Sequence, residues 1–325
     1  MPQIVRLDGF ESIQQEWEEI LPSCSTNTIF VTPWWQRVWW RHFGDGQELC
    51  LLSVRDGSET LGIGPLMIAD GVVSFVGGTD LFDYHDFLVP AGRERAFYTV
   101  LVDYLSTMDW QSLELSSLRQ GSPTLVHLPA MAEARGYRVE VSEEDMAPAM
   151  ALPPTWEEYV AALSKKDRHE LRRKLRKLEA GGPFRQVVRE DPESIREGMS
   201  DFFRLLRASS PEKADFMTGQ RERFFANIGD ELGARGQFRL AFLEVEGARA
   251  ASCINLVYAD ACLLYNSGYD PDYSELSVGI LNKALAVKDA IETGKRSFDF
   301  LRGAERYKYS LGARDHALYR MTVRR

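Results

Sequence analysis

Residues 261–303 read ACLLYNSGYDPDYSELSVGILNKALAVKDAIETGKRSFDFLRG, and this stretch decides the fold of the second half of the chain. An apolar run leads into a polar loop, a helical stretch over about 277–292 and a second apolar run at 296–303. Four apolar side chains fall on one face of the helical stretch: Ile280, Ala284, Val287 and Ile291. A helix that links two strands makes a crossover, so the pattern predicts two parallel neighbouring strands.

Strands and helices ahead of this unit extend the prediction to the whole chain. A short turn separates two apolar runs, at 236–247 and 248–260. These runs predict an antiparallel meander that continues into the apolar run beginning at residue 261. The first half repeats this order in blurred form, and the proline-rich segment 146–155 separates the halves. We therefore predict an α/β fold (α+β, with mixed sheets) in two related domains, residues 1–150 and 151–325.

Composition excludes several classes of protein. Of the 325 residues, 44% are hydrophobic and 27% charged, as in globular proteins, and no apolar run is long enough to span a bilayer. The N-terminus lacks a basic segment followed by an apolar one, so we expect a cytoplasmic protein. Scattered histidines and isolated cysteines predict no metal, and the net charge of −9 argues against general nucleic-acid binding.

Polar residues crowd the end of the last parallel strand. They are Asp299, Arg302, Glu305, Tyr307 and Lys308. Ligands of α/β sheets bind outside the carboxyl ends of parallel strands, so this cluster predicts the rim of a cleft; a solvated loop with ion pairs is the alternative.

The preceding helix begins at a second candidate site. Its first residues are Ser277, Val278, Gly279 and Ile280. Free N–H groups at a helix N-terminus bind anions, although Ser277 as a simple helix cap explains the same pattern.

A third candidate lies in the first half, at 80–86. Its polar residues after a Gly-Gly pair include Asp83, Tyr84, His85 and Asp86. Neighbouring carboxylates raise one another's pKa, so one of them is a candidate base and the segment a candidate acceptor site between the domains. A polar hairpin loop explains the segment equally well.

The helix predicted at 164–179 is basic on an acidic protein. Eight lysines and arginines stand there against three acidic residues: Lys165, Lys166, Arg168, Arg172, Arg173, Lys174, Arg176 and Lys177 against Asp167, Glu170 and Glu179. Such a run is either a solvated helix face or a patch for an anionic ligand.

Several of these motifs together resemble a known family. The pattern SVGIL at 277–281 with FDFLRGAERYKYSLG at 298–312 is similar to the C-terminal region of CelD-like proteins of the GNAT superfamily. KKDRHELRRKLRKLE at 165–179 and FVGGTDLFDYHDFLV at 75–89 also resemble that group, so the likeness covers most of the chain. The group is associated with bacterial polysaccharide biosynthesis and is related to the Fem peptidyltransferases.

The resemblance implies two tandem GNAT-like acyltransferase domains and an N-acyltransferase activity. Acetyl-CoA or another acyl-CoA would be the co-substrate, bound by the segment 277–280, and a small molecule or a saccharide-linked amine the acceptor. Asp83, His85 or Asp86, or an intervening water, would take the proton. Arg302 and Lys308 would hold a phosphate or carboxylate of donor or acceptor, and the other polar residues named above would contact substrate.

One departure keeps two alternatives open. GNAT enzymes bind the pyrophosphate of coenzyme A with a loop of the form Q/R-x-x-G-x-G/A, whereas residues 274–279 read SELSVG and keep only the final glycine. Glu275 adds a negative charge there. The alternatives are a Fem-like transferase that uses aminoacyl-tRNA bound by the basic helix, and a non-catalytic GNAT-fold protein that binds a partner.

Overall fold

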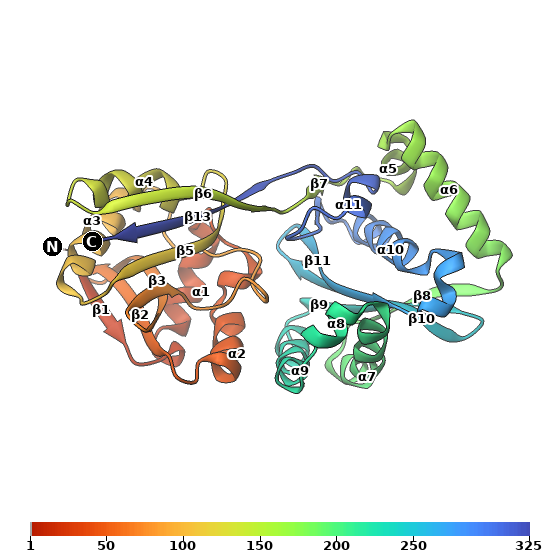
Figure 1. Cartoon of the computed structure of the whole chain (residues 1–325), viewed down its shortest axis with the longest axis horizontal. Coiled ribbons are helices and arrows are strands. Elements are labelled where there is room, and N and C mark those ends of the chain that lie inside the picture. Colours follow the sequence, from red (N-terminus) through yellow and green to blue (C-terminus); the bar gives the residue numbers. More distant parts are fainter. Residues whose placement is uncertain (1) are drawn as a thin grey trace. The chain divides into compact units, whose positions relative to one another are not determined.

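The computed structural model describes residues 2–325 and divides the chain into two compact units (Figure 1). The first unit runs to Met146 and takes back the C-terminal segment His316–Arg325, and the second is Ala147–Asp315. The junction falls in the proline-rich segment that the sequence singles out. The C-terminal segment, however, lies with the first unit, whereas the sequence had grouped it with residues 151–325.

The first unit contains a seven-stranded mixed sheet. In spatial order its strands are β1 (Gln3–Leu7), β2 (Glu48–Asp56), β3 (Glu59–Ala69), β4 (Val72–Phe75), β5 (Ser112–Arg119), β13 (Ala317–Arg324) and β6 (Arg138–Met146). Its α-helices are α1 (Gln14–Ile20), α2 (Pro33–Phe43), α3 (Glu94–Thr107) and α4 (Pro123–Glu133), and its short 3-10 turns are η1 (Phe10–Ser12), η2 (Leu21–Ser23) and η3 (Ile29–Val31). Helix α3 joins β4 to β5, which pair in parallel.

Strand β13 enters this sheet from the far end of the chain. It pairs antiparallel with β5 on one side and with β6 on the other (Figure 1). Leu318, Met321 and Val323 are buried, and the last two join the core that α3 covers. The pairing joins segments nearly two hundred residues apart, so the local pattern of the sequence does not reveal it.

The second unit contains a six-stranded mixed sheet. In spatial order its strands are β7 (Ala149–Ala151), β12 (Ser297–Asp299), β11 (Ala261–Tyr269), β10 (Ala248–Tyr258), β9 (Phe238–Val245) and β8 (Phe184–Arg189). Its helices are α5 (Trp156–Ala162), α6 (Lys165–Ala180), α7 (Pro192–Ser209), α8 (Pro211–Phe216), α9 (Gly219–Gly233), η4 (Pro271–Leu276), α10 (Val278–Glu292) and α11 (Arg306–Ser310). The meander β9–β10–β11 and the crossover through α10 to a parallel β12 agree with the prediction.

Helices cover both faces of this second sheet (Figure 1). Along β9, Ala241 and Leu243 lie in one core with α5, α6 and α10. Leu240 and Phe242 point to the opposite face, where both approach Gly198 of α7. This alternation is the ordinary period of a strand buried on both sides.

Both pairs of parallel strands are short. The strands separate after a few residues, and the candidate site lies beside such a separation. Strands β4 and β5 are paired at three positions, from Val72↔Ser112 to Ser74↔Glu114. Strands β11 and β12 are likewise paired at three positions, from Ala261↔Ser297 to Leu263↔Asp299. Beyond these positions the two chains of each pair part, and we call the space between them the wedge of that unit.

Candidate active site

A pocket of about 250 Å³ lies at the N-terminus of α10 in the second unit. Its lining comes from the end of β11, the loop before α10, the first turns of α10 and α11: Tyr269, Ser274, Ser277, Val278, Gly279, Ile280, Lys283 and Tyr307. The four residues that the sequence proposes for donor binding, 277–280, are thus together on its wall, as is Tyr307. Their role in binding a donor stays a prediction.

The start of α10 presents backbone N–H groups to this pocket. Ser277 adopts the left-handed conformation, with φ 58°, and its carbonyl accepts the N–H of Leu281 at 3.1 Å. The N–H groups of residues 278–280 precede this first helical hydrogen bond and are available to a ligand. The helix dipole adds partial positive charge at the same place, which favours an anion.

The basic helix α6 reaches the same loop. Lys174 Nζ donates to Ser277 Oγ at 3.2 Å, so a lysine ammonium stands at the N-terminus of α10. Lys177 Nζ lies 3.0 Å from the carboxylate of Glu275, whose side chain is 89% exposed. Glu275 is the negative charge by which the sequence departs from the usual donor loop. It is paired with Lys177 and directed to solvent, and the two basic residues Lys174 and Lys177 accompany it.

Lys308 stabilises the turn that follows β12, on the side of the wedge away from β11. Its side chain is 2% exposed, and Nζ donates to the carbonyls of Leu301 (2.9 Å), Arg302 (2.6 Å) and Gly303 (2.9 Å). Glu305 Oε2 lies 2.9 Å from the same ammonium. An ammonium has three N–H donors, so these partners satisfy it. The sequence predicted that Lys308 would hold a substrate anion or act in catalysis; in the structure it binds the chain's own carbonyls.

Asp299 acts on the same turn. Its carboxylate accepts the N–H of Leu301 at 2.8 Å, and Leu301 has a positive φ of 59°. Asp299 and Lys308 therefore stabilise an unfavourable backbone conformation directly after β12. Arg302 is partly buried in this turn and Glu305 is exposed beside it, and substrate binding by either remains a prediction.

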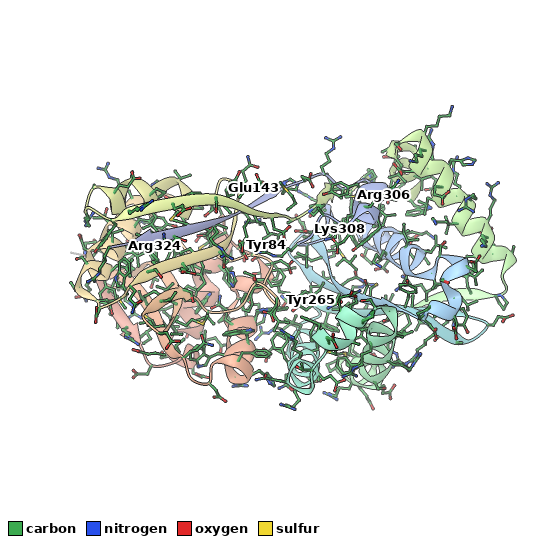
Figure 2. All side chains as sticks on the ribbon, in the orientation of Figure 1. Tyr84, Glu143, Tyr265, Arg306, Lys308 and Arg324 are labelled. Atoms are coloured by element: carbon green, nitrogen blue, oxygen red, sulfur yellow. The ribbon has the colours of Figure 1, made fainter. Side chains whose placement is uncertain are left out.

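The sequence analysis missed two lysines of the second unit, of which Lys283 lies on the pocket wall. Lys283, on the second turn of α10, donates to the Gly279 carbonyl at 3.0 Å and stands 4.8 Å above the ring of Tyr307. Lys213, on α8, donates to the carbonyl of Ser267 on β11. Lys213 lies on a helix that the sequence analysis did not single out, and Lys283 lies one turn beyond the candidate segment 277–280. Figure 2 marks Tyr265 on β11, one of the two strands that form the wedge, and Lys308 on α11, which follows β12.

Burial and mutual repulsion disfavour the charge on these lysines. Burial, with the nearby ammonium groups of Lys213 and Lys308, lowers the pKa of Lys283 to about 8, although Cys253 and Glu305 oppose the shift. Burial also lowers the pKa of Lys213, again against the opposing effect of Glu305. The pocket wall therefore carries one lysine, Lys283, whose charged form is disfavoured by its burial.

The segment 77–90 occupies the wedge of the first unit. The N–H of His85 donates to the carbonyl of Ser117 on β5 at 3.1 Å, and its ring stacks between Phe75 and Phe82 at 5.7 Å and 4.7 Å. His85 is 3% exposed. The histidine proposed as a base is therefore a core residue of the first unit.

Asp86 is buried in the same core. Its carboxylate accepts the hydroxyls of Ser122 and Thr124 and the N–H of Phe87. Burial raises the pKa of Asp86 to about 6, although these hydrogen bonds oppose the shift. Its oxygens are engaged at the start of α4, and its role as a base stays a prediction.

Tyr84 and Asp83 complete the third predicted cluster. Tyr84 is buried, with the guanidinium of Arg119 5.5 Å from its ring centroid, and Asp83 is partly exposed. Both belong to the first unit, and their role in holding an acceptor stays a prediction. Over residues 2–325 no three His, Cys, Asp or Glu side chains gather as a metal site. No helix in that described range is long and apolar enough to cross a membrane.

Comparison with known proteins identifies the second unit. The model of the acetyltransferase (GNAT) domain family matches residues 165–309, from α6 to α11. The matched part includes the whole pocket and the wedge of β11 and β12. Residues 165–309 are therefore a GNAT-type acetyltransferase domain, and the protein is an acyltransferase.

Solved structures extend the likeness to both units. The crystal structure of FemX covers 98% of this chain and 96% of its own, with 11% identity and a TM-score of 0.68. The C-terminal domain of a putative lysylphosphatidylglycerol synthetase from Agrobacterium fabrum covers 98% and 92%, with 10% identity and a TM-score of 0.61. A tandem GNAT protein from the clavulanic acid biosynthesis pathway covers 99% and 98%, with 14% identity and a TM-score of 0.52.

These likenesses establish a fold of two tandem GNAT-like domains, as the sequence predicted. At such low identity they speak for the fold alone. No curated protein sequence matches the chain. The narrower likeness to CelD-like proteins of polysaccharide biosynthesis is a matter for proposal.

Proposed function

We propose that the second unit transfers an acyl group from an acyl-CoA to an amine of a small-molecule or saccharide-linked acceptor. The observation that carries this proposal is the pocket at the N-terminus of α10, inside the matched acetyltransferase domain and beside the wedge of β11 and β12.

The backbone of β11 suits the donor arm. Past Leu263 this strand is no longer paired with β12, so its edge can approach an extended amide chain, although Ser267 already donates its N–H to Asn266 Oδ1 and accepts from Lys213. An N–H group on this edge is also the type of donor that stabilises the oxyanion formed when an amine attacks a thioester. The pantetheine arm would thus lie along β11 beyond Leu263.

The start of α10 suits the donor phosphates. The N–H groups of residues 278–280, the hydroxyl of Ser277 and the ammonium of Lys174 converge there. Lys174, whose ammonium also pairs with Glu170 at 3.2 Å, brings positive charge to the loop in which Glu275 adds a negative one. We therefore propose that ordinary coenzyme A binding survives the departure from the loop pattern, through a lysine donated by α6.

Calorimetry with coenzyme A and acetyl-CoA tests the donor. We expect the wild type to bind coenzyme A, and Lys174→Met to weaken binding about 10-fold, because one hydrogen-bonded charge contributes on the order of 1.5 kcal/mol. Lys166→Met is the matched control, since Lys166 is exposed on the same helix. Absence of coenzyme A binding by the folded wild type, or equal effects of the two substitutions, would reject this donor site.

Turnover tests the reaction. Acetyl-CoA incubated with amino sugars and amino-sugar nucleotides should yield an acetylated product that mass spectrometry detects. A panel of longer acyl-CoA donors defines the acyl group. If the protein binds coenzyme A but acylates no amine in the panel, the non-catalytic, partner-binding alternative gains the stronger support.

A second candidate function is a Fem-like transfer from aminoacyl-tRNA. The observation in its favour is the outer face of α6, where Lys165, Lys166, Arg172 and Arg176 are all exposed. Charge reversal at Arg172 and Arg176 should then abolish tRNA binding, and the affinity of the wild type should fall steeply with salt. tRNA binding that is unaffected by the charge reversals and by the salt concentration would exclude this candidate.

A further inference from the structure

The charges of α6 are divided between the two sides of the helix. Leu171 and Leu178 are buried and define the side that faces the core. At about 100° per residue, the opposite half holds exposed basic side chains and one histidine. They are Lys165, Lys166, His169, Arg172, Arg173, Arg176 and Lys177. The three acids of the helix, Asp167, Glu170 and Glu179, fall at the margins of this half or on the inward side.

Four of these cations have no carboxylate to pair with. Arg173 pairs with Glu170 at 2.8 Å and Lys177 with Glu275 at 3.0 Å. Within residues 2–325, no carboxylate lies within ion-pair distance of the other four exposed basic side chains. We call these four the outer stripe of α6: Lys165, Lys166, Arg172 and Arg176. The stripe extends about 16 Å along one straight helix, at about 1.5 Å per residue.

The packing of α6 directs the outer stripe away from the second unit. Leu171 and Leu178 lie in the same core as Leu281 and Val287 of α10. Figure 1 shows α6 at the margin of the second unit, on the far side of α10 from the sheet. The unpaired charges therefore face away from the unit that carries them, where an extended anionic surface can reach all four.

We propose that the outer stripe of α6 binds the anionic surface of a phospholipid bilayer. Each lysine or arginine held at such a surface raises the binding constant about five-fold. The apolar side chains of α6 are turned to the core, so the contact is electrostatic and nothing inserts among the acyl chains. This inference goes beyond the proposed acyl transfer and does not depend on it.

A flat surface fits the outer stripe better than a folded polynucleotide does. The whole chain has 39 basic and 48 acidic residues, so the excess of positive charge is confined to α6. Glu157 and Glu158 are exposed on α5, directly before it. A folded RNA presents phosphates on many sides and is matched by basic residues spread over a broad surface. A bilayer is contacted along one side, which is what a single row of cations on one helix offers.

Co-sedimentation of the full chain with lipid vesicles tests the proposal. One set of vesicles is phosphatidylcholine, and the other contains about one third phosphatidylglycerol. We expect binding to the anionic vesicles alone at about 0.05 M sodium chloride, and its loss at about 0.5 M, because salt screens exposed charges. The double variant Arg172→Glu/Arg176→Glu should bind the anionic vesicles at least about 30-fold more weakly, since it removes two of the four cations.

A matched control separates the stripe from net charge. Arg95→Glu/Arg223→Glu changes the net charge equally, at exposed arginines of α3 and α9. It should bind within about three-fold of the wild type, because neither arginine lies on α6. Circular dichroism and thermal unfolding show that both double variants are folded. Lys165→Glu/Lys166→Glu provides a second reversal within the stripe and should act like the first.

Four results would overturn the proposal. They are equal binding to neutral and anionic vesicles, equal effects of the stripe and control reversals, release from vesicles by sodium phosphate but not by sodium chloride of equal ionic strength, and binding of tRNA without binding of anionic vesicles. The third would assign the stripe to free phosphate and the fourth to tRNA. The acyl-transfer assay contains no vesicles, and the vesicle assay contains no acyl donor, so each can fail while the other succeeds.

Discussion

The two wedges of this protein start alike and end differently. In each unit a parallel strand pair holds for three positions and then parts. In the first unit residues 76–93 separate β4 from α3, and this long segment folds back into its own wedge. In the second unit only residues 270–277 separate β11 from α10, and a pocket lies at that position.

The side chains beside each wedge differ as much as the lengths. The first unit buries Phe82, His85 and Phe87 with the hydrogen-bonded carboxylate of Asp86. The second unit has Lys283 on the wall of its pocket and Lys308 bound to the carbonyls of the turn after β12. The comparison teaches that the strand–helix–strand frame alone does not make a site. The connection between strand and helix decides whether the wedge becomes core or pocket.

The largest effect should come from Lys308→Met. This change leaves three carbonyls of the turn without their buried donor, so we expect the free energy of unfolding to fall by about 3–5 kcal/mol. Urea unfolding followed by circular dichroism measures it, with Lys288→Met as the exposed control. An unchanged stability with lost acyl transfer would instead return Lys308 to the catalytic role that the sequence suggested.

Asp86→Ala should have the next largest effect, and in the first unit. It leaves the hydroxyls of Ser122 and Thr124 and the N–H of Phe87 without their acceptor, at a cost of about 2–3 kcal/mol in the free energy of unfolding. Asp45→Ala, in an exposed turn, is the control. If Asp86→Ala leaves the protein fully stable and removes only activity, Asp86 is a base and the comparison between the wedges fails.

Ser277→Val tests the donor loop at the start of α10. A β-branched side chain at φ 58° should lower the free energy of unfolding by about 1–2 kcal/mol, because the left-handed backbone conformation favours glycine. Ser277→Gly should be nearly neutral, since relief of strain offsets the loss of the contact with Lys174. Thermal unfolding of both variants distinguishes a backbone requirement from a side-chain one. Equal melting temperatures for the two would show that the loop is not strained.

The smallest effect should be the pH dependence that Asp86 confers. Its folded pKa of about 6 lies above the unfolded value of 3.8, so the folded state binds more protons between these values. The burial penalty is present above pH 6 and is relieved as the pH falls, which should add about 1 kcal/mol of stability between pH 7 and pH 5. Asp86→Asn should lack this gain. Urea titrations at the two pH values measure the difference, and parallel pH profiles would contradict it.

Much of the frame follows from local pattern. The apolar period of 280–291 predicted α10, the flanking apolar runs predicted two parallel strands, and the charge run predicted α6. Proline and glycine punctuation predicted a division between residues 150 and 151, and the structure divides the chain after Met146 and again after Asp315. The structure places residues 277–280 and Tyr307 on the wall of one pocket, because a strand–helix–strand unit brings its own ends together.

What the sequence by itself determined about this protein is therefore the strand–helix–strand frame and the place where a ligand can enter it, since both depend on residues close along the chain. Only the tertiary structure decided the place of β13 between β5 and β6, the burial of His85 and Asp86, and the position of Lys283 above the ring of Tyr307. These depend on contacts between segments separated by tens to hundreds of residues. Residue type and local period carry no information about which distant segment will fill a wedge.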